Sequence, residues 1–440
     1  MLIENGFLMH CLQYSSESCL YMEYFDRNTY LEWFHRWKDI KIIKVVTGVR
    51  RSGKSTLFKI YQEDLINHGV NSSQIINVNF EDLSFEHLLN YRELYRYLSE
   101  RIQPDRMTYL FLDEIQHVDS FQKAVDSLFL KDNVDIYITG SNAYLMSGEL
   151  ATLLTGRYVE LHVMPLSFHE FCSGYEIVNR ATETNINLWN LYLSTGSFPF
   201  VLQNQMHPTE AQEYMRGIYN TILLHDVVGR LKISDVSMLE DVARFLFSNI
   251  GSRTSPAAIA RYMTSNARKI DPKTVERYLR GLTDSLLFYE ARRYNIKGRQ
   301  VLKTSSKFYA CDVAMRNMLV KGSASDIGHI LENIVFLELK RQYSDVYVGQ
   351  INTDGEIDFV AIRNGRPEYY QVCASALDEG VLERELKPLI GISDNYPKYL
   401  LTLDSVFKDM DYDGIHKLNA IEWMRQEGSC PDHRAVPAEN

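Results

Sequence analysis

Cysteine is scarce in this chain, and its cysteines are not arranged in pairs. The 440 residues contain six of them, far apart in the sequence: Cys11, Cys19, Cys172, Cys311, Cys373 and Cys430. Zinc sites and dithiol redox sites use closely spaced cysteines such as C-x-x-C, and the sequence contains no such pair. It therefore indicates neither kind of site, and we predict a reduced, cytoplasmic location.

Long apolar runs are also missing. No stretch approaches the roughly 20 apolar residues that a membrane-spanning helix needs, so we expect no membrane partner. The N-terminus has Glu4 but no early lysine or arginine, which is a poor match to a secretory signal. Residues 1–21 show little periodicity, and we interpret them as an extension or as the product of an upstream start.

An excess of basic residues is the third absence. The formal net charge is −10 at pH 7, so the chain as a whole is not attracted to nucleic acid, although a local basic face is compatible with this charge. Apolar residues make up 45% and charged residues 24%, the composition of a soluble globular protein. A chain of this length is expected to form two to three domains.

The strongest positive signal is the segment Gly-Val-Arg-Arg-Ser-Gly-Lys-Ser-Thr at residues 48–56. It matches the pattern G-x-x-x-x-G-K-[ST] at every fixed position. Residues 40–47 predict a strand before it and residues 55–65 a helix after it, the context in which such a loop wraps its N–H groups around phosphates. We predict that the nucleotide is bound by Gly48, Val49, Arg50, Arg51, Ser52, Gly53, Lys54, Ser55 and Thr56.

A second signal is the pair of acids that ends a later strand. Residues 109–112 predict a buried strand, and Asp113 and Glu114 follow it directly, which is the Walker B pattern. In such a site Asp113 and Ser55 hold Mg²⁺, while Lys54 contacts the β- and γ-phosphates. Glu114 is the predicted general base that polarises the attacking water. ATP and Mg²⁺ are thus the predicted cofactors.

Further strands are predicted at residues 75–80, 135–139 and 158–163, with helical segments between them. This alternation favours a parallel α/β sheet. Glu81 and Asp82 follow the first of these strands, and they belong either to the ligand crevice or to the capped start of a helix.

Five sequence blocks, taken in order, resemble one protein family. The blocks are residues 48–56, Leu-Asp-Glu-Ile-Gln at 112–116, Thr-Gly-Ser-Asn at 139–142, Gly-Arg-Tyr at 156–158 and Pro-Leu-Ser-Phe-His-Glu-Phe at 165–171. The chain resembles the prokaryotic AAA-type P-loop ATPases that carry a C-terminal domain of unknown function. The resemblance covers nearly the whole chain. It implies an ATP-binding core, a helical lid with a winged helix, and a domain similar to PD-(D/E)xK nucleases.

Three polar residues beside the later strands are candidates for further catalytic roles. Ser141 and Asn142 follow a strand where AAA-type ATPases keep a γ-phosphate sensor, and they are equally suited to cap a helix at 143–150. Arg157 is a candidate arginine finger, because a guanidinium binds a phosphoryl group through two hydrogen bonds. It would act in its own site or in a neighbour's. The alternative is a surface arginine before an edge strand.

Residues 238–310 have the rhythm of a winged helix, with three helices followed by a hairpin. The third helix and the hairpin are rich in basic residues, namely Lys273, Arg277, Arg280, Arg292, Arg293, Lys297, Arg299, Lys303 and Lys307. Such a face indicates contact with DNA phosphates. A solvated face, or a winged helix that serves only as a structural lid, stays open as the alternative.

The last predicted domain lacks one part of the nuclease site that it resembles. Glu332 on a helix, Asp358 in a strand and Gln371 in the next strand fit the acidic and Q-x-K positions of such a site. Its acids hold Mg²⁺, and its lysine orients water and offsets negative charge. Cys373 stands at the lysine position and supplies no positive charge. We therefore predict a degenerate, binding-only domain.

Together these signals predict an α/β protein with a P-loop NTPase parallel sheet of the AAA type, a helical and winged-helix domain, and a small α/β nuclease-like domain. The predicted boundaries are 1–37 for an extension and leading helix, 38–175 for the ATPase domain, 176–322 for the lid and winged helix, 323–427 for the nuclease-like domain and 428–440 for a tail. The predicted function is ATP hydrolysis that gates the C-terminal domains, with an unknown protein client. The alternatives are an ATP-controlled DNA-binding switch and, less favoured, a metal-dependent nuclease.

Overall fold

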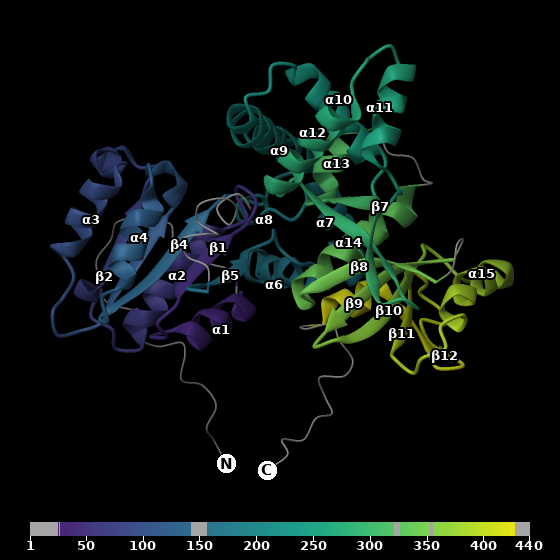
Figure 1. Ribbon diagram of the computed structural model, residues 1–440. Coiled ribbons are helices and arrows are strands. Elements are labelled where there is room, and N and C mark those ends of the chain that lie inside the picture. Colours follow the sequence, from purple (N-terminus) through teal and green to yellow (C-terminus); the bar gives the residue numbers. More distant parts are fainter. Residues whose placement is uncertain (1–24, 26, 142–155, 321–325, 352–354, 427–440) are drawn as a thin grey trace, which may run out of the picture.

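The computed structural model describes residue 25 and residues 27–141, 156–320, 326–351 and 355–426 (Figure 1). Asn142, the predicted helix at 143–150, the N-terminal extension and the C-terminal tail therefore lie outside the described residues. None of the described helices is long and apolar enough to cross a bilayer.

A parallel five-stranded sheet forms the core of the N-terminal region (Figure 1). Its strands are β1 (Ile43–Thr47), β2 (Ile75–Asn79), β3 (Thr108–Asp113), β4 (Val134–Gly140) and β5 (Tyr158–His162), in the order β2-β3-β4-β1-β5. The strands β1, β3 and β4 are buried along their whole length, as expected for central parallel strands covered on both faces. Because all five strands are parallel, the segments that follow them meet at one edge of the sheet. This arrangement confirms the predicted fold class.

Helices cover both faces of this sheet. They are α1 (Asn28–Trp37), α2 (Lys54–Asn67), α3 (Tyr91–Ser99) and α4 (Phe121–Phe129). The apolar stripe of α1 places Tyr30 and Phe34 in one buried cluster with Phe58 of α2 and Tyr137 of β4. The leading helix therefore packs on the first sheet, and the boundary after residue 37 stays a prediction.

A set of helices follows the first sheet. It comprises α6 (Phe168–Asn179), α7 (Asn185–Thr195), α8 (Pro199–Gln203), α9 (Pro208–Thr221), a π-helical segment (Ile222–Gly229), α10 (Val236–Ser248), α11 (Pro256–Ser265), α12 (Pro272–Asp284) and α13 (Val313–Leu319). Side-chain hydrogen bonds to the backbone explain where two of these helices begin. Ser167 and Glu170 form a capping box at α6, and Asp271 caps α12 ahead of Pro272. Because α6 continues to Asn179, it crosses the predicted boundary after residue 175.

The second sheet crosses the predicted boundary after residue 322. Its strands are β6 (Phe288–Asn295), β7 (Gln300–Ala310), β8 (Asp345–Gln350), β9 (Glu356–Arg363), β10 (Arg366–Val372), β11 (Lys398–Thr402), β12 (Asp409–Tyr412) and β13 (Ile415–Asn419), in the order β12-β13-β11-β10-β9-β8-β6-β7. The predicted hairpin is present as β6 and β7, but it is not a free wing, because residues 293–295 of β6 pair in parallel with residues 348–350 of β8. The hairpin and the strands from β8 to β13 therefore belong to one sheet.

Three helices pack on the second sheet: α14 (Ile327–Gln342), α15 (Glu379–Ile390) and α16 (Ala420–Arg425). The helix α14 contributes to the large core that runs from the helical region into the sheet, whereas α15 covers a separate apolar cluster. The core around α14 contains residues from Phe168 to Met424, so the helical region and the second sheet are one continuous body.

Candidate active site

The loop between β1 and α2 turns sharply and is tied to the body of the protein. Arg51 and Gly53 have left-handed backbone conformations, with φ angles of 66° and 99°. A Cβ atom at Gly48 would lie 2.2 Å from the carbonyl oxygen of Val163, so only glycine fits there. Ser52 is fully buried. The loop is therefore held in shape at the N-terminus of α2, where backbone N–H groups and the helix dipole favour an anion.

Arg27, just before α1, supports this loop from behind. Its guanidinium is 5% exposed and donates hydrogen bonds to the carbonyl oxygens of Ser52 at 2.9 Å and of Met164 at 2.7 Å. It also pairs with the carboxylate of Glu170 at 2.9 Å. Burial alone would lower the pKa of Arg27, but Glu170 outweighs burial and the pKa rises. The sequence does not point to Arg27, because its partners Ser52, Met164 and Glu170 lie 25, 137 and 143 residues further along the chain and no local motif relates them.

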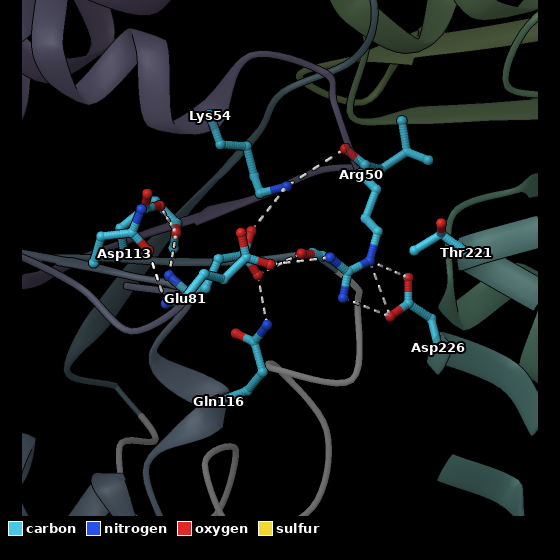
Figure 2. A network of polar contacts seen from close by, with 12 residues as sticks. Arg50, Lys54, Glu81, Asp113, Gln116, Thr221 and Asp226 are labelled. Carbon is cyan, nitrogen blue, oxygen red and sulfur yellow. Dashed lines mark hydrogen bonds and ion pairs between the residues drawn. The ribbon is translucent and has the colours of Figure 1, made fainter. Parts of the chain in front are cut away.

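The residues predicted from the two Walker patterns come together at this loop (Figure 2). Lys54 Nζ donates a hydrogen bond to the carbonyl oxygen of Gly48 at 3.0 Å and lies 3.6 Å from Glu114 Oε1. Asp113, the last residue of β3, accepts hydrogen bonds from the hydroxyls of Thr139 and Ser55. Lysine, serine and both acids are thus in one place, as the sequence predicts.

Glu114 is held in a strained and nearly enclosed position. Its backbone is left-handed, with a φ angle of 55°, and the residue is 6% exposed. Its Oε2 accepts hydrogen bonds from Ser141, at the end of β4, and from Gln116. Burial would raise the pKa of this carboxyl, but the charge of Lys54 and these hydrogen bonds lower it. The ionised form that a general base requires is therefore favoured.

Arg157 does not reach this site. Its carbonyl oxygen accepts a hydrogen bond at 2.8 Å from the N–H of Ile43, at the start of β1, whereas the phosphate loop follows the end of that strand. The length of β1, roughly 15 Å at about 3.3 Å per residue, separates the two. The guanidinium pairs with Asp126 and lies over the ring of Phe129. Arg157 as a finger for its own site is therefore wrong, and a role in a neighbour's site stays a prediction.

The arginine that lies at the site is Arg50, within the loop. Its guanidinium pairs with Asp226, with an Nε–Oδ2 distance of 3.0 Å, and with Glu81 at 3.1 Å (Figure 2). Asp226 belongs to the π-helical segment, so the helical region supplies an acid to the phosphate loop. Glu81 thus lies beside the loop, whereas Asp82 caps the helical turn at 83–88. No sequence motif marks Asp226, because its partner lies 176 residues away.

His162, at the end of β5, links the phosphate-loop strand to the second sheet. Its Nδ1 lies 3.2 Å from Thr47 Oγ1, and its Nε2 lies 2.9 Å from the hydroxyl of Tyr289 in β6. Burial, followed by the positive charges of Lys340, Lys54 and Arg341, lowers the pKa of His162 to about 4. The imidazole is thus neutral in the folded protein at neutral pH.

We expect this histidine to make the protein sensitive to acid. The unfolded chain binds a proton at His162 near pH 6.5, whereas the folded chain resists it until about pH 4, so the contribution to stability is complete above about pH 6.5 and falls as the pH drops below it. Thermal unfolding at about pH 7.5 and about pH 5 tests this. The loss of Tm on acidification should be smaller in His162→Gln than in the wild type, and equal losses would contradict the assignment.

The basic residues predicted to contact DNA have several different environments. Those with exposed side chains are Arg277, Arg280, Arg292, Lys297 and Arg299. Lys297 and Arg299 line a pocket of about 370 Å³ beside Tyr294 and Tyr369, at the tip of the hairpin. Arg293 is partly buried where β6 pairs with β8. Lys307 is buried, and its prediction as part of a basic wing is wrong because three carboxylates surround it.

Comparison with known proteins agrees with these features. Residues 41–172 match the family model described as an AAA domain, and residues 186–326 match a domain of unknown function, DUF8612. An uncharacterized protein of Haemophilus influenzae is 35% identical over 401 residues, which cover 91% of this chain and 98% of that protein. One of Methanocaldococcus jannaschii is 31% identical over 362 residues, which cover 78% of this chain and 77% of that protein.

A Walker-type ATPase of Pyrococcus abyssi is among the similar solved structures, with a TM-score of 0.47 and 16% identity over 67% of this chain and 96% of that chain. The match to the H. influenzae protein spans nearly the full length of both chains, and the matched AAA domain contains the loop, both acids and the parallel sheet. The chain therefore belongs to the same family as that relative, and its N-terminal region is an AAA-type P-loop ATPase domain.

Proposed function

We propose that this protein hydrolyses ATP in a Mg²⁺-dependent reaction and that its nucleotide state is transmitted to the C-terminal region. The observation that carries the proposal is the ion pair between Arg50 of the phosphate loop and Asp226 of the π-helical segment. This contact joins the place where phosphates bind to the helices that lead into the second sheet.

The residues beside the loop fit a magnesium ion. The Ser55 hydroxyl and the Asp113 carboxylate are hydrogen-bonded to each other, so two hard oxygen donors of the kind that Mg²⁺ prefers lie together. Burial raises the pKa of Asp113 despite the hydrogen bonds from Thr139 and Ser55, and a bound cation favours its ionised form. When bound, Mg²⁺ offsets the charge of the phosphates. Ser55 and Asp113 are the residues that would hold it.

The remaining polar residues are suited to positioning and proton transfer. The ammonium of Lys54, held over the loop by the carbonyl oxygen of Gly48, supplies positive charge for the β- and γ-phosphates. Glu114 takes the proton of the attacking water, and Ser141 and Gln116 fix the direction of its carboxylate. These roles need a cation at Lys54, an ionised carboxylate at Glu114 and hydrogen-bond donors beside that carboxylate, and the structure has such groups at these positions.

The electrostatics of Asp226 explain how a change at the loop can reach the helices. Asp226 is 7% exposed, and burial raises its pKa although Arg50 opposes this. Removing its partner would leave a buried charge unpaired, at a cost of about 3–5 kcal/mol. A triphosphate in the loop competes with Asp226 for the Arg50 guanidinium. Because π-helical turns are rare and often lie at functional sites, the segment that carries Asp226 is the element we expect to rearrange.

Hydrogen exchange in the Glu114→Gln variant tests the coupling, because ATP stays bound without turnover. We expect ATP to change the exchange of residues 222–229, and we expect an added Asp226→Asn substitution to abolish that change while ATP still binds. Lys54→Ala is the control in which ATP should change nothing. If ATP binds to Glu114→Gln and leaves the exchange of residues 222–229 unaltered, the proposed transmission to the helices would be refuted, and the proposal of ATP hydrolysis would stand apart from it.

A further inference from the structure

Lys307 of β7 is buried within a group of three carboxylates. Its Nζ lies 2.8 Å from Glu332 Oε1, 3.1 Å from Glu356 Oε1 and 3.5 Å from Asp358 Oδ1. The Lys307 side chain is 6% exposed. Tyr309, on the same face of β7, donates a hydrogen bond of 2.7 Å to Glu332 Oε1. Because these groups come from β7, α14 and β9, the contacts join three elements that are far apart in the sequence.

Two of these acids are those predicted from the nuclease resemblance. The structure brings Glu332 and Asp358 together at Lys307, as the resemblance implies, but it does not complete the rest of the site. Gln371 lies beside Asp358, since its Oε1 accepts the backbone N–H of Asp358 at 3.4 Å, and its amide group donates a hydrogen bond to Glu385 at 2.9 Å. Cys373 follows β10, and burial raises the pKa of its thiol to about 12, so the residue is neutral. The cation of this cluster therefore comes from another strand.

The residues present do not fit the metal ion that such a site would hold. The carboxylate oxygens already have partners, since Asp358 Oδ2 accepts the N–H of Val372 at 2.9 Å and Glu356 also pairs with Arg253. A divalent cation would have to share this largely buried site with the ammonium of Lys307, and like charges repel strongly where the dielectric constant is low. In the part of the chain that the structure describes, no group of three or more His, Cys, Asp or Glu side chains is arranged to hold a metal.

We propose that the ammonium of Lys307 takes the place of the metal ion of the nuclease-like fold, so that Glu332, Glu356 and Asp358 form a permanent ion-pair cluster rather than a hydrolytic centre. Burial by itself would lower the pKa of Lys307, but the three carboxylates raise it, so the lysine keeps its charge.

The cluster has a clear mechanical consequence. The strand β7 is the outermost strand of the second sheet, where it pairs with β6, and its other edge forms a bridge from Ser306 to Thr254. Its side chains Lys307 and Tyr309 anchor this edge to α14 through Glu332 and, through Asp358, to β9. The hairpin, which follows α12 in the chain, is therefore fastened to α14 and β9.

Calorimetric titration of the nucleotide-free, full-length chain with Mn²⁺ tests the replacement. The Lys307→Met variant keeps the length of the side chain and loses the charge. We expect it to gain a saturable Mn²⁺ site, with binding about tenfold or more tighter than any binding by the wild type, and a Tm that rises with Mn²⁺. Lys307→Arg, the control that retains the charge, should gain no site. A Lys307→Met variant that folds but gains no Mn²⁺ site would overturn the proposal.

A second measurement does not depend on whether Lys307→Met folds. The wild type and Asp358→Asn are titrated with Mn²⁺ and incubated with duplex DNA and Mn²⁺. We expect the two proteins to give the same titration and no cleavage. Wild-type binding of Mn²⁺ that is lost in Asp358→Asn, or cleavage that this substitution abolishes, would show a working metal site and refute the replacement.

Discussion

The Glu114→Gln variant should bind ATP as the wild type does and hydrolyse it roughly 10²- to 10⁴-fold more slowly. A carboxamide has nearly the shape of a carboxylate and still accepts a hydrogen bond from Ser141, so the site keeps its form. It has no negative charge and is too weak a base to take a proton from water. Phosphate release with Mg²⁺ and ATP measures the loss of turnover, and a fluorescent ATP analogue measures the retained affinity.

Two further variants define what this result means. Lys54→Ala should lose both binding and turnover, because the triphosphate loses its principal cation. Glu93→Gln removes an acid from an exposed ion pair with Arg96 on α3, away from the loop, and should leave both unchanged. Undiminished turnover in Glu114→Gln would refute its role as general base. Unchanged ATP affinity in Lys54→Ala would place the nucleotide elsewhere.

Arg27→Ala should be the most destabilising substitution around the site, with a loss of about 3–5 kcal/mol in the free energy of unfolding. The change leaves the buried carboxylate of Glu170 without its partner and removes the donors to the carbonyl oxygens of Ser52 and Met164. Because Ser52 belongs to the phosphate loop, ATP affinity should fall as well. Denaturant unfolding followed by circular dichroism gives the first quantity, and nucleotide titration gives the second.

Two further variants test whether the loss of stability comes from the burial of the Arg27–Glu170 ion pair rather than from the loss of any ion pair. Arg96→Ala breaks an exposed pair with Glu93 and should cost no more than about 1 kcal/mol. Adding Glu170→Gln to Arg27→Ala removes the unpaired buried charge and should recover part of the lost stability. A loss in Arg27→Ala as small as that in Arg96→Ala would mean that the loop does not depend on this arginine.

Local pattern was enough to locate most elements and the centre of the site. The strand, loop and helix around residues 48–56 lie where the motif and its flanking periodicity put them, and so do β3 and the acids that follow it. The three helices and the hairpin of residues 236–310 were also expected. These predictions succeeded because each depends on residues that are close together in the chain, where backbone geometry relates spacing to structure.

The failed predictions all concern partners that are distant in the sequence. Arg157 precedes the expected strand, but parallel pairing of β5 with β1 puts it at the edge of the sheet opposite the phosphate loop. The basic composition of the hairpin predicts that Lys307 belongs to a basic wing. The hairpin instead pairs with β8 through β6, and Lys307 of β7 lies against Glu332 of α14.

The sequence by itself determined the chemistry of the nucleotide site. A contiguous loop supplies the lysine and the serine, one strand end supplies the two acids, and the parallel direction of the strands brings these segments to the same edge of the sheet. The tertiary structure decided which charges meet. Arg50 and Asp226 are 176 residues apart, and Lys307 and Asp358 are 51 apart, so their pairing depends on how separate elements pack. Burial then makes those pairs consequential, because an unpaired charge in the interior is far more costly than one in water.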